Sequence, residues 1–377
     1  MQRLTGRDVR ARRLARHGLT APLDDPTPAG AARAMHAVHA QVMPAAEVSV
    51  AIRVPGATRE TVAAALADGS LTKVFGPRST VHLVPTTDLP AWVGALGAVP
   101  PGRSPFAADV RLSDEQRDDV LAAIGEALLL GDLTVDELDR EVVARAGSWA
   151  GELVMPAFQG FWPRWRQAVA DAGARGLLVF GAPRGRLVTY THPRRRDPAF
   201  APWPAERALP WFRDGYLRAF GPASPEHLAR WLVAPVAWCT DLFTGAEEVA
   251  VDDGTAWVCA GDTAPEGLGR SVRLLPYFDA LTVGFVPRSA MFPGRAWERA
   301  LARGQAGNFP VVLVDGVVRG VWHQRSRGRY VEVTVETWGS FGALRRRQLD
   351  AQVERLGAVL GRTPRLTRGP VSVGPHA

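Results

Sequence analysis

AARAMHAVHAQVMPAAEVSVAIRVPG (residues 31–56) and LADGSLTKVFGPRSTVHLVP (residues 66–85) carry the strongest structural signals in the N-terminal part of the chain. The first carries a polar pair two positions apart, His39 and Gln41, in an otherwise apolar run. A capped helix begins near Thr58, and the second stretch alternates in the pattern of a short hairpin. Helices followed by such a hairpin are typical of a winged-helix unit.

The spacing of the polar pair predicts the shape of its backbone. The apolar pattern favours a helix over about 30–42. Side chains two residues apart point the same way only in an extended segment, whereas on a helix they diverge by about 200°. We therefore expect residues 39–41 to be extended or irregular, with Pro44 marking the end of the helix. The alternative is a hydrogen-bonded histidine in a seam between helices, with Gln41 facing water.

The same order of helices and hairpin recurs in the middle of the chain. Ser113 and Thr134 each begin a capping box, which predicts two helix starts. Residues 161–172 have the pattern of a third helix, and residues 177–191 that of a hairpin with a Gly/Pro-rich tip.

A third copy follows. Its pattern predicts helices over 205–220, from Ser224 and over 236–243, and then a hairpin over 248–259. We therefore predict three tandem winged-helix units, at residues 1–98, 106–200 and 201–262.

The C-terminal part changes character, because four segments between residues 270 and 335 alternate in the strand period. A final helix is predicted over 342–360, and the tail after Gly361 is expected to be loose. The predicted fold class is thus α+β. Three winged-helix units precede a small antiparallel β-barrel or sheet domain, residues 268–365, which carries the C-terminal helix.

Composition limits the class of protein. The 377 residues are 46% hydrophobic, which predicts a folded, globular chain of several units. No apolar run reaches the roughly 18 residues of a membrane span, and the basic N-terminus has no apolar core of a secretory signal. We therefore expect no membrane association, and a cytoplasmic, nucleoid-associated protein.

The formal net charge of +7 favours a polyanionic partner, for which DNA or RNA is the default candidate. Two groups of arginines are candidates for this contact. Arg184 and Arg186 flank the tip of the second predicted hairpin, where they could enter a groove or follow phosphates. A second group follows soon after and has the composition of a patch that binds phosphates: Arg194, Arg195 and Arg196. The alternative is a solvated turn with basic decoration.

Cysteine usage argues against a metal site. Cys239 and Cys259 are twenty positions apart, and neither belongs to a Cys-x-x-Cys or His-x-x-x-His pattern. We expect two buried thiols, no structural disulfide, no metal and no cofactor.

Several strings in this order resemble one family. The chain is similar to the winged-helix DNA glycosylases of the AlkZ/YcaQ type over about residues 5–360. The strings that carry the resemblance are His39-Ala-Gln41, Gly76-Pro-Arg-Ser-Thr-Val-His82-Leu-Val-Pro85, Phe220-Gly-Pro-Ala-Ser-Pro225, Leu274-Leu-Pro-Tyr-Phe-Asp279 and Val312-Leu-Val-Asp-Gly-Val-Val-Arg-Gly-Val-Trp322.

The resemblance assigns roles to particular residues. The family's catalytic motif, Gln-x-Gln or Gln-x-Asp, falls on His39-Ala40-Gln41, with histidine in the first position. A histidine can hold a water molecule and can also accept a proton, which a glutamine cannot. The resemblance also implies that three residues of the first hairpin lie near the site and contact DNA: Arg78, Thr80 and His82.

Asp279 and Arg288 belong to a further family pattern, Phe-Asp followed by Arg, and are candidates for residues that support the site. For this pattern we favour a structural ion pair or a turn cap over a direct part in catalysis.

The implied activity is removal of N7-alkylated guanine, including bulky natural-product adducts or crosslinks, from double-stranded DNA, with a possible part in self-resistance to a genotoxin. Alkylation at N7 makes the base cationic and a good leaving group. The enzyme then has to stabilise an oxocarbenium-like sugar and place a water on C1′, which a hydrogen-bonding pair achieves by position and polarity.

Lys73 is the only lysine, and it lies in a predicted strand. Glycosylases that also cut the strand use an amine to form a Schiff base with the sugar. We therefore expect a monofunctional enzyme, and a monomer by analogy with the family. The alternatives are a non-catalytic winged-helix DNA binder, such as a transcription regulator, and a nucleic-acid scaffold without sequence preference.

Overall fold

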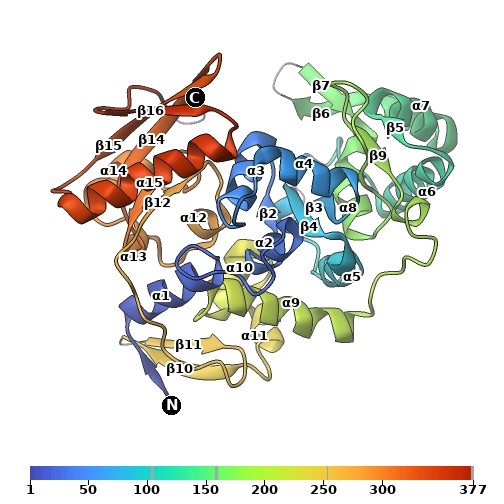
Figure 1. The fold of residues 1–377 in the computed structure, drawn as a ribbon. Helices are drawn as coiled ribbons and strands as arrows, with labels where there is room; N and C mark the ends of the chain where they lie inside the picture. The colour runs from blue at the N-terminus through green and yellow to red at the C-terminus, as the bar shows by residue number, and fades with distance from the viewer. Residues whose placement is uncertain (103–105, 158–159, 253, 375–377) are drawn as a thin grey trace.

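The structure is a computed structural model that describes residues 1–102, 106–157, 160–252 and 254–374. Helices and strands alternate along the chain, which confirms the predicted mixture of helix and sheet. The described strands form five separate sheets. Figure 1 shows helices α3 (Met43–Ala51) and α4 (Arg59–Ala67) in the centre, between the C-terminal sheet on one side and helices α6 (Asp114–Leu130) and α7 (Val135–Ala146) on the other. No described helix is long and apolar enough to cross a membrane.

The N-terminal elements are short helices around a three-stranded sheet in the order β2-β4-β3. The 3₁₀ turn η1 joins β3 to β4. The predicted helix from Thr58 and the hairpin after it are confirmed. The elements are α1 Gly6–Arg16, α2 Pro28–Ala34, β2 Val38–His39, α3 Met43–Ala51, α4 Arg59–Ala67, β3 Leu71–Phe75, η1 Pro77–Ser79, β4 Val81–Pro85 and α5 Leu89–Gly97.

The helix predicted over 30–42 is wrong in its second half. Helix α2 stops at Ala34, and His36 (φ 47°) and Ala37 (φ 77°) are both left-handed. They turn the chain so that β2 pairs with β4. Strand pairing across the fold outweighs the local helical pattern here. The expectation that the segment at His39 is extended is confirmed.

The middle region is a helical group with two small sheets. Both capping boxes, at Ser113 and Thr134, are confirmed. The helix predicted over 161–172 is only partly correct. Its first residues form strand β7, because Pro163 lacks an amide donor and favours an extended residue before it. The elements are α6 Asp114–Leu130, β5 Leu133–Thr134, α7 Val135–Ala146, β6 Leu153–Ala157, β7 Gly160–Pro163, η4 Arg164–Ala168, α8 Val169–Ala174, β8 Val179–Phe180 and β9 Thr189–Thr191.

The third group matches its predicted elements closely. Strand β1, Arg3–Leu4, adds to this group from the start of the chain by pairing parallel with β10. The remaining elements are α9 Ala205–Phe220, α10 Pro225–Leu232, α11 Val236–Leu242, β10 Glu247–Val251 and β11 Gly254–Val258.

The C-terminal part is an open five-stranded sheet in the order β12-β13-β14-β15-β16, not a closed barrel. The pairs are antiparallel except β15–β16, which is parallel. The tail after Gly361 is not loose, because it supplies β16. The elements are β12 Val272–Leu275, α12 Ala280–Gly284, α13 Arg288–Met291, α14 Arg295–Ala300, β13 Val311–Val314, β14 Val317–Arg327, β15 Tyr330–Thr337, α15 Ala343–Val359 and β16 Thr363–Arg368.

One apolar core joins the two ends of the chain. Val48 and Val62 of the N-terminal helices pack in the same cluster as Val331 of the sheet and Leu349 of α15, and all four are buried. Burial of side chains on this scale is the main favourable term in folding. It fixes β2 and η1 beside the segments that carry α12 and α13.

Candidate active site

His39 lies at the end of β2, directly opposite His82 of β4. The next residue continues the extended path, since the Ala40 amide donates to the Val81 carbonyl over 2.7 Å. His39 is only 9% exposed, whereas Gln41 is exposed. The two side chains of the predicted pair therefore differ in surroundings, and only His39 is enclosed.

Aromatic rings hold the His39 imidazole. It stacks on Phe278 with ring centroids 4.9 Å apart and meets the edge of His82 at 5.2 Å. Its Nδ1 atom is buried and has no hydrogen-bond partner in the described structure. The predicted alternative, a hydrogen-bonded histidine between helices, does not describe this arrangement. An unpaired buried nitrogen is costly and needs an explanation.

His39 lines a cavity of about 290 Å³. Segments far apart in the sequence form the cavity: β2, η1, α10, α12 with the residues on either side of it, α13, and residues 305–306. None of its described lining residues is acidic. The lining residues with most bearing on chemistry are Arg78, His227, Arg230, Trp231, Phe278 and Arg288.

The imidazoles around this cavity are held neutral. Burial and then the charge of Arg78 together lower the pKa of His39 to about 4. Burial and then the neighbouring His39 bring the pKa of His82 to about 3. The pKa of His227 is about 4, chiefly through burial. At neutral pH His39 is thus a hydrogen-bonding group that carries no charge.

The three candidates of the first hairpin have different surroundings. Arg78 lines the cavity in a left-handed conformation (φ 62°), and its Nη1 donates to the Trp231 carbonyl over 2.8 Å. The Thr80 hydroxyl donates to Pro77 within its own turn. His82 is buried behind His39, with Nδ1 2.9 Å from the Thr80 carbonyl oxygen. Arg78 alone of the three reaches the cavity.

Asp279 and Arg288 do not pair with each other. Asp279 is fully buried and forms two hydrogen bonds, of 2.8 and 2.9 Å, with the guanidinium of Arg53. It also accepts from Ser49 and caps α12 through the Leu281 amide. Burial raises the pKa of this carboxyl, but Arg53 and Ser49 hold it below its ordinary value. An ion pair that also caps a helix is the structural role that the sequence favoured.

Arg184 and the arginines of residues 194–196 lie outside the cavity wall, beside β8 and β9. Acidic groups already engage two of them: Arg184 pairs with Glu137 at 2.8 Å and Arg195 with Asp132 at 3.2 Å. Arg194 donates to the Phe200 carbonyl, while Arg186 and Arg196 are exposed. This group is separate from the His39 cavity.

His227 and Arg230 are site residues that the sequence did not reveal. Both lie on α10, which contacts η1 although the two are about 150 positions apart. The only local signal was the string Ser224-Pro-Glu-His, which places His227 at the third helical position. There its Nδ1 accepts from the Ser224 amide.

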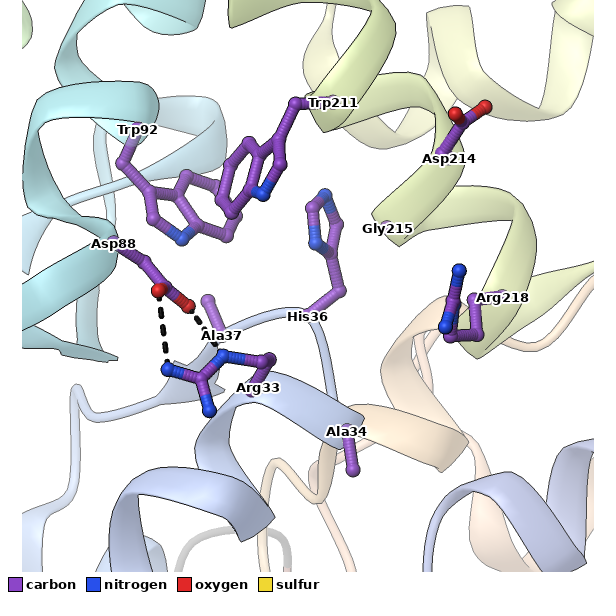
Figure 2. Close-up of a pocket in the computed structure, with 10 residues that line it drawn as sticks. All are labelled: Arg33, Ala34, His36, Ala37, Asp88, Trp92, Trp211, Asp214, Gly215 and Arg218. Carbon is purple, nitrogen blue, oxygen red and sulfur yellow. Dashed lines mark hydrogen bonds and ion pairs between the residues drawn. The ribbon is translucent and has the colours of Figure 1, made fainter. Parts of the chain in front are cut away.

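A second cavity, of about 320 Å³, lies on the other side of the turn that precedes β2. Figure 2 shows His36 in its middle, between Trp211 and Gly215, with Trp92 beside them. Trp231, which lines the His39 cavity, stacks on His36 at 5.6 Å. His36 therefore connects the aromatic walls of the two cavities.

Buried neutral histidines predict a stability that depends on pH. The pKa values of His17, His36 and His82 are about 3, in each case chiefly through burial. The unfolded chain takes up these protons near 6.5, so stability is complete above that pH and falls as the pH drops towards the folded values. At pH 5 the loss is about 2 kcal/mol for each. The midpoint of thermal unfolding should fall steeply from pH 7 to pH 5.

The variant His36→Phe provides the control for this prediction, because a phenyl ring suits the aromatic surroundings and takes up no proton. Its unfolding midpoint should depend less on pH than that of the wild type. If the unfolding midpoint depended equally on pH in the two proteins, the low pKa of His36 in the folded protein would be contradicted.

Comparisons with known proteins place the chain among DNA glycosylases. The model of the AlkZ-like DNA glycosylase family matches residues 32–359. The chain therefore belongs to the family of AlkZ-like DNA glycosylases, as the sequence resemblance implied.

One curated relative is the interstrand DNA cross-link repair glycosylase of Streptomyces sahachiroi. It is 28% identical over 344 residues, which cover 84% of this chain and 87% of that protein. The solved structure of the Streptomyces sahachiroi DNA glycosylase AlkZ superimposes with a TM-score of 0.81 at 24% identity, covering 98% of this chain and 100% of the other. The comparison of structures shows a shared fold.

Proposed function

We propose that this protein is a monofunctional DNA glycosylase that hydrolyses the N-glycosidic bond of N7-alkylguanine in double-stranded DNA and leaves an abasic site. The observation that carries the proposal is the enclosed, uncharged His39, which lines a cavity without an acidic lining residue among those described and whose buried Nδ1 has no hydrogen-bond partner. Membership of the glycosylase family supports it.

The proposed reaction needs little acid catalysis. The C1′–N9 bond breaks, and the cationic alkylguanine leaves as a neutral base with the bonding electron pair. Water then forms a bond to C1′, and its proton passes to His39 or to solvent. A weakly basic imidazole holds the water and accepts the proton as that water becomes acidic. Gln41, exposed two residues further along, is proposed to position the water or the lesion from the mouth of the site.

We also propose how the chain contacts DNA. Residues 1–98, 106–200 and 201–262 would act as three winged-helix units, and residues 268–365 as the C-terminal unit. The hairpins β3–β4, β8–β9 and β10–β11, each after helices, support this. The DNA near the lesion would be contacted by three residues of the first hairpin, Arg78, Thr80 and His82. The DNA backbone further away would be contacted by Arg184, Arg186 and Arg194–Arg196.

The proposed lesions are bulky natural-product adducts or crosslinks, with a role in self-resistance to a genotoxin. The similarity to the interstrand DNA cross-link repair glycosylase of Streptomyces sahachiroi supports the crosslink class. The test compares duplexes with one N7-methylguanine, one bulky N7 adduct or no damage. A glycosylase should bind the undamaged sequences alike and release base only from alkylated ones. A regulator would instead prefer one undamaged sequence and release nothing.

The proposed product is an uncut strand. The Lys73 ammonium lies 4.5 Å from the centre of the Phe180 ring, and Lys73 is not among the residues that line the cavity. We expect no strand cleavage until base or heat is applied, and no covalent complex on borohydride reduction. Gel analysis of the product checks this. Cleavage that disappears in Lys73→Ala would contradict it.

A further inference from the structure

Three guanidinium groups meet in the His39 cavity. They come from η1 (Arg78), α10 (Arg230) and α13 (Arg288). Arg78 is held by the Trp231 carbonyl, and Arg288 donates to the carbonyls of Thr282 and Val283 over 3.3 and 3.4 Å. Within the described part of the chain, no carboxylate forms an ion pair with any of the three.

This absence of counter-charge sets the three apart from Arg184 and Arg195 near β8 and β9, which pair with Glu137 and Asp132. Burial lowers the pKa of Arg78, and the charge of Arg288 adds to that effect. Burial and then Arg230 do the same to Arg288. Like charges brought together and partly buried destabilise one another, and an anion in the cavity would relieve that repulsion.

We propose that Arg78, Arg230 and Arg288 bind one backbone phosphate next to the lesion and so hold its sugar against His39. Guanidinium forks match the geometry of phosphate oxygens. His39, which lines the same cavity, has a buried Nδ1 without a hydrogen-bond partner. This inference rests on the proposed glycosylase function.

The phosphate resolves an electrostatic conflict in the proposed reaction. A cavity with three guanidinium groups repels both a cationic base and an oxocarbenium-like sugar. A phosphodiester that enters with the lesion neutralises part of this charge, so the negative group comes from the substrate. The three arginines are therefore positioning residues. They bind only the backbone, and they favour no particular adduct.

The test removes phosphate charges one at a time. A series of duplexes is made, each with one N7-methylguanine and one methylphosphonate at a different linkage around the lesion. Binding of each duplex to wild type and to Arg230→Gln is measured. Arg230 is exposed, so its replacement leaves the fold intact. At one linkage the neutral analogue should weaken wild-type binding by about 10- to 100-fold. It should weaken binding of Arg230→Gln by a clearly smaller factor, because only two of the three guanidinium groups then remain on the phosphate.

Arg347→Gln provides the matched control, because Arg347 is exposed on α15 and does not line the cavity. It should keep the full methylphosphonate effect. Arg230→Gln should also lower the slope of binding against salt concentration by about one. Effects that are equal at all linkages, or equal in wild type and Arg230→Gln, would overturn the proposal.

A second arm separates a backbone phosphate from a free one. Inorganic phosphate is titrated against the protein without DNA, and thermal unfolding is followed. Binding that is lost in Arg230→Gln, without any effect of a single linkage in DNA, would show a site for free phosphate and overturn the proposal. Both arms measure binding, so a wild type that releases no base would refute the glycosylase function without obscuring this result.

Discussion

Replacing His39 with alanine is expected to slow release of the alkylated base by about 100- to 10,000-fold, the usual contribution of a positioned acid–base group. Binding to the duplex should change little, because the side chain is only 9% exposed and the arginines remain. Single-turnover base release and duplex affinity, measured on the same preparations, check both statements.

His39→Gln distinguishes the two ways in which the imidazole could act. Glutamine can hold a water molecule through hydrogen bonds, but its neutral amide cannot take the proton of that water. If positioning dominates, this variant should stay within about 10-fold of wild type while His39→Ala does not. The wild-type rate should be level from neutral pH down to about pH 5 and decline as His39, with its pKa of about 4, becomes protonated. Full base release by His39→Ala would exclude a catalytic role for His39.

The largest effect on stability is expected at the buried ion pair. Asp279→Ala leaves the Arg53 guanidinium, which is fully buried, without its counter-charge. The loss should be about 3–5 kcal/mol in the free energy of unfolding. Measured by denaturation, the double variant Arg53→Met with Asp279→Leu should recover most of the loss, because no isolated charge then remains in the core.

The exposed pair of Arg327 and Glu332 is the matched control. Its nitrogen and oxygen are 2.9 Å apart, but the two side chains are 57% and 41% exposed. Glu332→Ala should therefore cost less than about 1 kcal/mol. Similar losses at the two pairs would contradict the structural role given to Asp279.

Features with local signals could be predicted from the sequence. The capping boxes at Ser113 and Thr134 set helix starts correctly, because the bonds involved span only three residues. The extended backbone at His39 followed from the spacing of two polar residues. Strand β16 was missed, because its register depends on β15, some thirty positions away.

The site depends even more on distant contacts. Helix α10 brings His227 and Arg230 to η1, and only the tertiary fold determines that approach. The sequence likewise could not show that Asp279 pairs with Arg53, because 226 positions separate the two residues. It paired His39 with Gln41 by their spacing and by the family motif, whereas in the structure one is enclosed and the other is exposed.

Detection of the released base itself tests whether the protein is a glycosylase that acts through His39. Wild type and His39→Ala are each mixed in excess with a duplex that carries one N7-alkylguanine, and free alkylguanine is quantified by mass spectrometry over time. We predict rapid release by wild type, an intact strand with one abasic site, and little release by His39→Ala. Alkylguanine that appears only at the spontaneous rate, while wild type remains bound to the duplex, would contradict the proposed glycosylase activity.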